Sequence, residues 1–135
     1  MPRISNIEIL HLPERPILRI RKVSSVEHFP SVIGGGFSRL AEHMAKAGGA
    51  LTDLPFVGFG GRDPGNMTVD VCFPLLEAVE GAEGIEAVML PAGEVAFCMY
   101  LGDYAKTMPV YEEMYAWMAG RGYRIPEISY EYYYN

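Results

Sequence analysis

The sequence repeats one plan of strands and a helix, and this internal repeat limits the chain more than any other feature. Leu12-Pro13 recurs as Leu90-Pro91, at an offset of 78 residues (90 − 12). Farther along, Met44 aligns with Met118 at an offset of 74 (118 − 44). The difference of the two offsets gives the first half about four extra residues, which we assign to the stretch "SVIGGGF". Self-similarity at a fixed offset is typical of a fold built from copies of one supersecondary unit.

Apolar patterning predicts a similar order of elements in each half. Strands are expected where apolar residues alternate, and helices where they recur three or four residues apart. The first half is predicted to form a strand, a helix and two strands, at 17–23, 37–49, 54–61 and 67–75. The second half is predicted to form two strands, a helix and a strand, at 84–91, 94–102, 108–122 and 125–135. A length of 135 residues suits a single domain, 1–135, with halves of about 5–75 and 84–135.

Composition and charge narrow the class of partner. Half of the residues are hydrophobic, and no apolar run reaches the roughly 20 residues of a membrane span. The first residues lack the apolar core of a signal peptide, so we expect a cytoplasmic protein without a membrane partner. The two cysteines are expected to be free thiols, although the sequence leaves a disulfide open. A net charge of −6 opposes direct nucleic-acid binding and suits a cationic partner better than an anionic one.

The chain ends in "SYEYYYN", where one carboxylate lies among four tyrosines. Aromatic residues favour strands, in which alternate residues share a face. Glu131 would then point the same way as Ser129 and Tyr133, whereas Tyr130, Tyr132 and Tyr134 would point the other way. The offset of 74 also aligns Glu131 with Val57 (131 − 74) and Tyr133 with Phe59 (133 − 74). Because ligand sites often form between structural units, we expect these four positions to meet at the seam of the halves.

Other motifs give no sign of a metal or a cofactor. The three histidines are spread along the chain without carboxylates or cysteines at ligand spacing. The stretches "GGG" (34–36) and "GFGGRDPG" (58–65) lack the lysine of a phosphate-binding loop, so we interpret them as close packing and a turn. We therefore predict no metal and no cofactor.

The order and spacing of several short motifs resemble those of the GyrI-like domain. The motifs are "LPAG" before a strand, "LGDY" entering a helix, "YAWM" and "GRGY" closing it, and "YEYY" in the last strand. Such domains are effector-binding modules, found behind DNA-binding domains of AraC-type and MerR-type multidrug-responsive regulators and also as stand-alone proteins. The resemblance covers nearly the whole chain, and the lack of a helix-turn-helix segment makes it resemble a stand-alone member.

The resemblance implies an α+β fold in which two βαββ-like repeats form a curved antiparallel sheet, with two helices flanking a central groove. It also implies that Glu131 supplies a negative charge at the groove floor and that Tyr133 forms an aromatic wall. A carboxylate among tyrosines suits a flat cation, by charge pairing and cation–π contact. Tyr104 and Tyr111, at the start of the second helix, could reach the groove or pack along the helix face.

Three functions stay open at this point. The one we prefer is a stand-alone binding module for hydrophobic, cationic small molecules such as drugs or effectors. The second is a hydrolase acting on a hydrophobic, cyclopropane-bearing electrophile, as in some proteins similar to this family, with Glu131 as general base. The third is a protein-interaction module, because exposed aromatic residues mark interfaces. The sequence does not identify the ligand, the oligomeric state or a regulator that acts with the chain.

Overall fold

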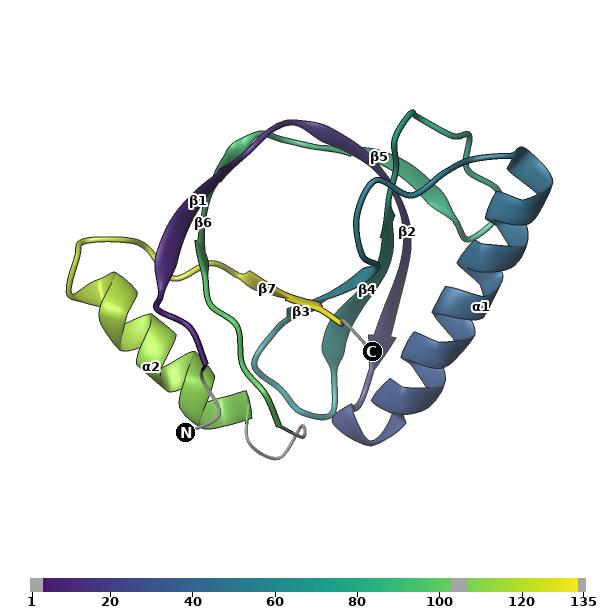
Figure 1. The fold of residues 1–135 in the computed structure, drawn as a ribbon. Coiled ribbons are helices and arrows are strands. Elements are labelled where there is room, and N and C mark those ends of the chain that lie inside the picture. Colours follow the sequence, from purple (N-terminus) through teal and green to yellow (C-terminus); the bar gives the residue numbers. More distant parts are fainter. Residues whose placement is uncertain (1–3, 103–106, 134–135) are drawn as a thin grey trace. The chain divides into compact units, whose positions relative to one another are not determined.

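The structure is a computed structural model that describes residues 4–102 and 107–133 (Figure 1). Two α-helices are described, α1 (Phe29–Ala47) and α2 (Thr107–Ala119), with a short 3-10 helix, η1 (Val26–His28), before the first. Neither α-helix has the length and hydropathy that a membrane crossing requires. The strands are β1 (Glu8–Leu12), β2 (Arg15–Ser24), β3 (Phe56–Gly60), β4 (Met67–Pro74), β5 (Glu86–Leu90), β6 (Gly93–Phe97) and β7 (Ile128–Tyr132).

The strands form two antiparallel sheets, each within its own compact unit. The five-stranded unit consists of residues 14–91 and 127–135, and its strand order is β5-β2-β4-β3-β7. The two-stranded unit consists of residues 1–13 and 92–126 and contains the β1-β6 pair and α2. The α+β class with two helices and antiparallel strands is confirmed, but the strands are divided between two open sheets instead of one.

The division between the sheets falls at the repeated Leu-Pro pair. One unit boundary follows Pro13, between β1 and β2, and another follows Pro91, between β5 and β6. Proline has no N–H to donate to a strand ladder, so it interrupts regular pairing. Each copy of the Leu-Pro motif therefore marks the point where the chain passes from a strand of one sheet to a strand of the other.

The strand pairings follow the same offset of 78. Adding 78 to Glu8–Leu12 gives Glu86–Leu90, which converts β1 into β5. Leu12 pairs with Gly93 in one sheet, and Leu90 pairs with Arg15 in the other (12 + 78 = 90; 15 + 78 = 93). The Leu12–Gly93 pair and the Arg15–Leu90 pair are therefore equivalent. Replacing each residue by its counterpart in the other half converts one pair into the other. The first strand, β1, was missing from the sequence prediction, which began its strands at residue 17.

Helix α1 is longer than the sequence predicted. It begins at Phe29, with a proline in its first turn, where the missing N–H costs nothing because the helix leaves that group unpaired. It ends at Ala47, and Gly48 follows with φ of 76°, a left-handed value that glycine adopts without strain. The prediction placed the helix start at residue 37, which was wrong by two turns.

The error came from the three glycines at 34–36, which lie inside the helix instead of opening it. Glycine is a poor helix former, so its presence normally argues against a helix interior. Gly36 has a packing reason: a Cβ there would lie 2.8 Å from Val71 Cγ2 on β4. The missing side chain lets α1 approach the sheet closely.

Helix α1 covers one face of the five-stranded sheet, mainly over β2 and β4 (Figure 1). Between helix and sheet lies the main core cluster, Leu18, Ile20, Leu40, Met44, Val57, Val69, Val71, Phe73, Leu75 and Ile85. A smaller cluster of Ile17, Phe56 and Cys72 lies on the opposite face, because successive residues of a strand alternate between faces. The five-stranded unit therefore has an α1 face and a far face.

Candidate functional site

Glu131 lies on β7, the edge strand of the five-stranded sheet, directly opposite Val57 on β3. Val57 is fully buried and belongs to the core cluster beneath α1. Directly paired residues of an antiparallel sheet point to the same face, so the half-buried carboxylate of Glu131 lies on the α1 face. The predicted adjacency of Val57 and Glu131 is confirmed by this register.

Tyr133 holds the carboxylate of Glu131. Its hydroxyl donates a hydrogen bond of 3.2 Å to Glu131 Oε1, and its ring packs against the main core cluster. Residues two apart on a strand share a face, which is why the pattern "EYY" at 131–133 brings this hydroxyl to the carboxylate. Packing fixes the ring, so the hydrogen bond also restricts the orientation of the carboxylate.

A hollow of about 390 Å³ opens beside Tyr133 on the α1 face. Its lining residues come from α1, from the segment before β3, from β4 and from the C-terminal strand: Phe37, Ser38, Ala41, Pro55, Phe73 and Tyr133. The lining is largely apolar, and the rings of Phe37 and Phe73 lie 6.0 Å apart at an interplanar angle of 24°. Such a hollow falls within the usual size range of small-molecule pockets, about 300–1,000 Å³.

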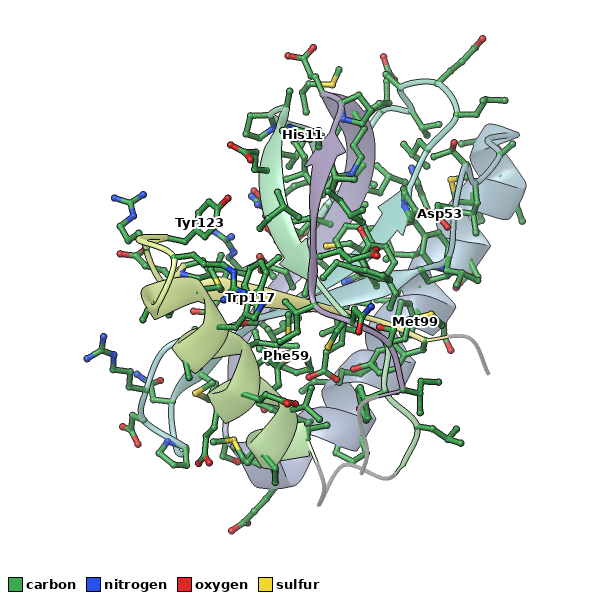
Figure 2. The ribbon with its side chains drawn as sticks, turned by 60° about the vertical axis from the view of Figure 1, so that its left-hand side comes forward. His11, Asp53, Phe59, Met99, Trp117 and Tyr123 are labelled. Atoms are coloured by element: carbon green, nitrogen blue, oxygen red, sulfur yellow. The ribbon has the colours of Figure 1, made fainter. Side chains whose placement is uncertain are left out.

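Phe59, the other residue predicted at the seam, lies opposite Ser129 on β7. Its ring, labelled in Figure 2, packs 5.2 Å from that of Phe29 at the start of α1. Ser129 on β7 and Tyr133, the residue after β7, lie on either side of Glu131, so Phe59 and Tyr133 are at opposite ends of this short row. The ligand-binding roles of Val57, Phe59, Glu131 and Tyr133 stay predictions.

Tyr130 and Tyr132 point away from Glu131, as the alternation predicted. Both pack on Phe56 of the far face, with ring centroids 5.4 Å and 4.7 Å from its own. Burial is the main cause that raises the pKa of each tyrosine above its ordinary value. These two tyrosines therefore help to cover the far-face core. Tyr134 lies outside the described residues.

Two ion pairs lie on the far face. Arg21 donates two hydrogen bonds to the buried Asp70, of 2.7 and 2.8 Å, and Arg19 pairs with Glu86 at 3.3 Å. Arg21 and Asp70 are direct partners on β2 and β4, and Arg19 and Glu86 are direct partners on β2 and β5. We interpret these pairs as structural, because each joins neighbouring strands in a fixed geometry.

Two predicted site residues remain, Tyr104 and Tyr111. Tyr104 lies outside the described residues. Tyr111 is on α2 in the two-stranded unit, where its ring lies 6.0 Å from that of Tyr115. Near the end of α2, the rings of Trp117 and Tyr123 are nearly parallel at 6.3 Å, with both residues labelled in Figure 2. A ligand role for Tyr104 or Tyr111 stays a prediction.

The histidines of the described chain lie at separate places. His28 Nδ1 is 2.7 Å from Ser25 Oγ, His43 Nε2 donates to the carbonyl of Glu80, and His11 lies 3.9 Å from Glu94. Within residues 4–102 and 107–133, no three His, Cys, Asp or Glu side chains cluster as metal ligands would.

Sequence reasoning missed most of the hollow, because its lining depends on how α1 lies across the sheet. One signal was present in the register. The register of β3 and β7 ends with Phe56 opposite Tyr132. Continued by one residue on each strand, it matches Pro55 with Tyr133. Both residues line the hollow. Phe37 was used only to predict the helix, and Ser38, Ala41 and Phe73 gave no signal by themselves.

The family described as the GyrI-like small molecule binding domain matches residues 5–135. No curated protein sequence matches the chain significantly. Among solved structures, the crystal structure of the EcmrR C-terminal domain superposes with a TM-score of 0.82 at 19% identity, over 98% of this chain and 85% of that one.

A second similar structure is the cryo-EM structure of an EcmrR–DNA complex in EcmrR-RPo. It superposes with a TM-score of 0.81 at 18% identity, over 97% of this chain. The match covers 50% of that chain, so this protein spans about half of the EcmrR length in the complex. At such identities, both similarities establish a shared fold and nothing finer.

Proposed function

Because this chain belongs to the GyrI-like family of small-molecule binding domains, we propose that it binds a hydrophobic, cationic small molecule on the α1 face of the five-stranded unit. The observation that carries the proposal is the contact between Glu131 and Tyr133 at the margin of an apolar hollow. Tyr133 lines the hollow with one part of its side chain and donates to the Glu131 carboxylate with its hydroxyl. The Glu131 carboxylate and the apolar hollow are therefore separated by no more than the length of the Tyr133 side chain.

Charge and exposure support a cation as the ligand. Glu131 is half-buried, so a cation beside it would be less screened by water than on an open surface. A carboxylate attracts a cation by its charge, and the ring of Tyr133 could add a cation–π contact. The net charge of −6 favours the approach of cations over anions.

The test uses two flat molecules of similar shape and different charge. N-methylacridinium carries a permanent positive charge, whereas acridine is uncharged in mildly alkaline buffer. We expect calorimetry to give tighter binding of the cation. Glu131→Gln, which keeps the size of the side chain and deletes its charge, should weaken cation binding by about 1–4 kcal/mol, the Coulomb energy of two close opposite charges near a protein surface, and leave acridine binding nearly unchanged.

Equal affinity for the two molecules, or a Glu131→Gln variant that binds the cation as tightly as the natural protein, would contradict the proposal. Mass spectrometry of the recovered ligand completes the test. A cyclopropane-bearing electrophile is incubated with the protein in a separate sample. Recovery of unchanged compound supports binding alone, whereas addition of water that is lost in Glu131→Gln would support the hydrolase alternative.

A further inference from the structure

We propose that the hollow beside Tyr133 is a second compartment of the ligand site, which takes a flat, uncharged, multi-ring arm of a cationic ligand. We further propose that the small side chains of Ser38 and Ala41 set the size of that arm. This inference rests on the proposed function, because it assumes that the charged part of the ligand lies at Glu131. It adds the part of the ligand that is not charged and the residues that select it.

The two compartments share Tyr133. The side chain lines the hollow and its hydroxyl lies 3.2 Å from Glu131 Oε1. A ligand with its cationic group at the carboxylate thus needs to extend by only about one tyrosine side chain to reach the hollow. Since Tyr133 packs against the core beneath α1, the separation between charge and hollow is fixed by packing.

Two of the residues that line the hollow, Ser38 and Ala41, are small side chains of α1. Ser38 and Ala41 are three residues apart on the helix, so they lie on the same side of it. Phe37 and Phe73 stack on each other beside them and form one wall. A leucine in place of either small residue would project into the space. Helix packing alone would favour a larger side chain there, because filling an apolar hollow removes surface from water.

Size and lining both suit a flat group of more than one ring. A dry cavity of about 150 Å³ accepts a benzene ring, and the hollow has about 390 Å³. Two walls are aromatic, formed by the Phe37–Phe73 pair and by Tyr133, and Pro55 adds a rigid apolar surface. Aromatic walls prefer offset-stacked or edge-on aromatic partners. The compartment therefore favours a fused, planar ring system over a branched aliphatic group.

The experiment uses a series of cations with one charge and an increasing number of fused rings. The probes are benzyltrimethylammonium, (naphthylmethyl)trimethylammonium and (anthracenylmethyl)trimethylammonium, which carry the same cationic group on an uncharged arm of one, two or three fused rings. Dissociation constants are measured by calorimetry. In the natural protein we expect affinity to rise along the series by about tenfold or more, the discrimination that small changes of apolar size give in a hydrophobic pocket. Ala41→Leu, which fills the hollow, should remove most of this gain while binding of the one-ring cation is retained.

Two variants make the result specific. Ala45→Leu places the same substitution one turn along α1, at an exposed position outside the lining, and should leave the whole series unchanged. Glu131→Gln should lower the affinity of every cation by a similar factor and preserve the gain from added rings. Thermal unfolding of each variant confirms that the fold is intact; Ala41 and Ala45 are both exposed helix positions that accept leucine well.

The outcomes separate this inference from the function on which it rests. If the cations bind through Glu131 but the series is flat, or if Ala41→Leu and Ala45→Leu behave alike, the second compartment is refuted and the cation site stands. If none of the cations binds the natural protein, the proposed function fails first. A ring-dependent gain lost only in Ala41→Leu supports the compartment.

Discussion

Val57 and Glu131 are direct partners across β3 and β7, and they are also equivalent positions of the repeat (131 − 57 = 74). When equivalent residues of two antiparallel strands face each other, a local two-fold axis passes between them. The repeat thus places a valine and a glutamate at one symmetric position. Because only one of the two is charged, the seam carries a single carboxylate instead of a repelling pair.

Substitutions of Val57 test how much a second carboxylate at this position lowers the free energy of unfolding. Val57 is fully buried, so Val57→Ala should lower the free energy of unfolding by about 2 kcal/mol through lost packing. Val57→Glu should cost about 4 kcal/mol or more, since it buries a carboxylate directly opposite Glu131. Urea unfolding followed by circular dichroism measures both variants.

The added cost of Val57→Glu should shrink in acid. Burial and a neighbouring like charge favour the neutral form of the introduced carboxyl, so protonation removes the penalty. Adding Glu131→Gln to Val57→Glu should also recover part of the lost stability. Equal stability of the alanine and glutamate variants at neutral pH would show that position 57 is not closely opposed to the carboxylate.

The hydroxyl and the ring of Tyr133 can be tested separately. Tyr133→Phe removes the hydrogen bond to Glu131 and keeps the wall of the hollow, so cation affinity should fall by about 0.5–1.5 kcal/mol. Tyr133→Leu removes the aromatic wall as well and should weaken N-methylacridinium binding further. Calorimetry on both variants gives the two losses, and a leucine variant no weaker than the phenylalanine variant would exclude a contribution from the ring.

Replacing the three glycines of α1 by alanine, one at a time, is expected to change the stability of the protein in opposite directions. Gly36→Ala should destabilise the protein by about 1–3 kcal/mol, because the added Cβ would lie 2.8 Å from Val71 Cγ2. Gly34→Ala and Gly35→Ala add a Cβ with no atom within 4 Å, so they should stabilise the helix by up to about 1 kcal/mol each. Thermal unfolding of the three variants decides the matter. Destabilisation by all three would mean that the helix needs glycine for another reason.

The same glycines show where sequence reasoning ends. The offsets of 78 and 74 predicted equivalent positions that the strand registers reproduce, because register follows side-chain alternation, which is local. The glycine run was misinterpreted because Gly36 owes its place to Val71, a residue 35 positions away (71 − 36). The hollow was missed for the same reason: Ser38 and Ala41 meet Tyr133 only through tertiary packing.

Removing Arg21 and removing Asp70 are expected to lower the free energy of unfolding by different amounts. Asp70 is 2% exposed, whereas the Arg21 side chain is 42% exposed. Arg21→Met leaves a buried carboxylate without its partner and should cost about 3 kcal/mol. Asp70→Leu leaves a guanidinium that can turn to water, so its cost should be smaller. A double-mutant cycle with both substitutions gives the coupling energy, and a larger loss for Asp70→Leu would reverse the assignment of the buried member.

Cys72 predicts a loss of stability in alkali. Burial, followed by the nearby Asp70 carboxylate, raises the pKa of the Cys72 thiol from 9.0 to about 12. Above pH 9 the unfolded chain then ionises this thiol while the folded protein keeps it neutral, so stability is present below about pH 9 and lost as pH rises toward 12. The thiol should contribute a slope of about 1.4 kcal/mol per pH unit within that window.

Cys72→Ala removes this titration. The variant should be less stable than the natural protein at neutral pH, because it loses buried sulfur at a site that is 1% exposed. The difference should narrow as pH rises above 9, since the alanine variant lacks the thiol contribution to the slope. Tyr130 and Tyr132, whose pKa values are raised chiefly by burial, steepen the alkaline slope in both proteins. The charge of Cys72 adds to both shifts, so the tyrosine contribution should be smaller in the alanine variant and should narrow the difference further. Urea unfolding at neutral pH and at intervals above pH 9 measures the slopes, and parallel curves would show that the Cys72 thiol does not titrate differently on unfolding.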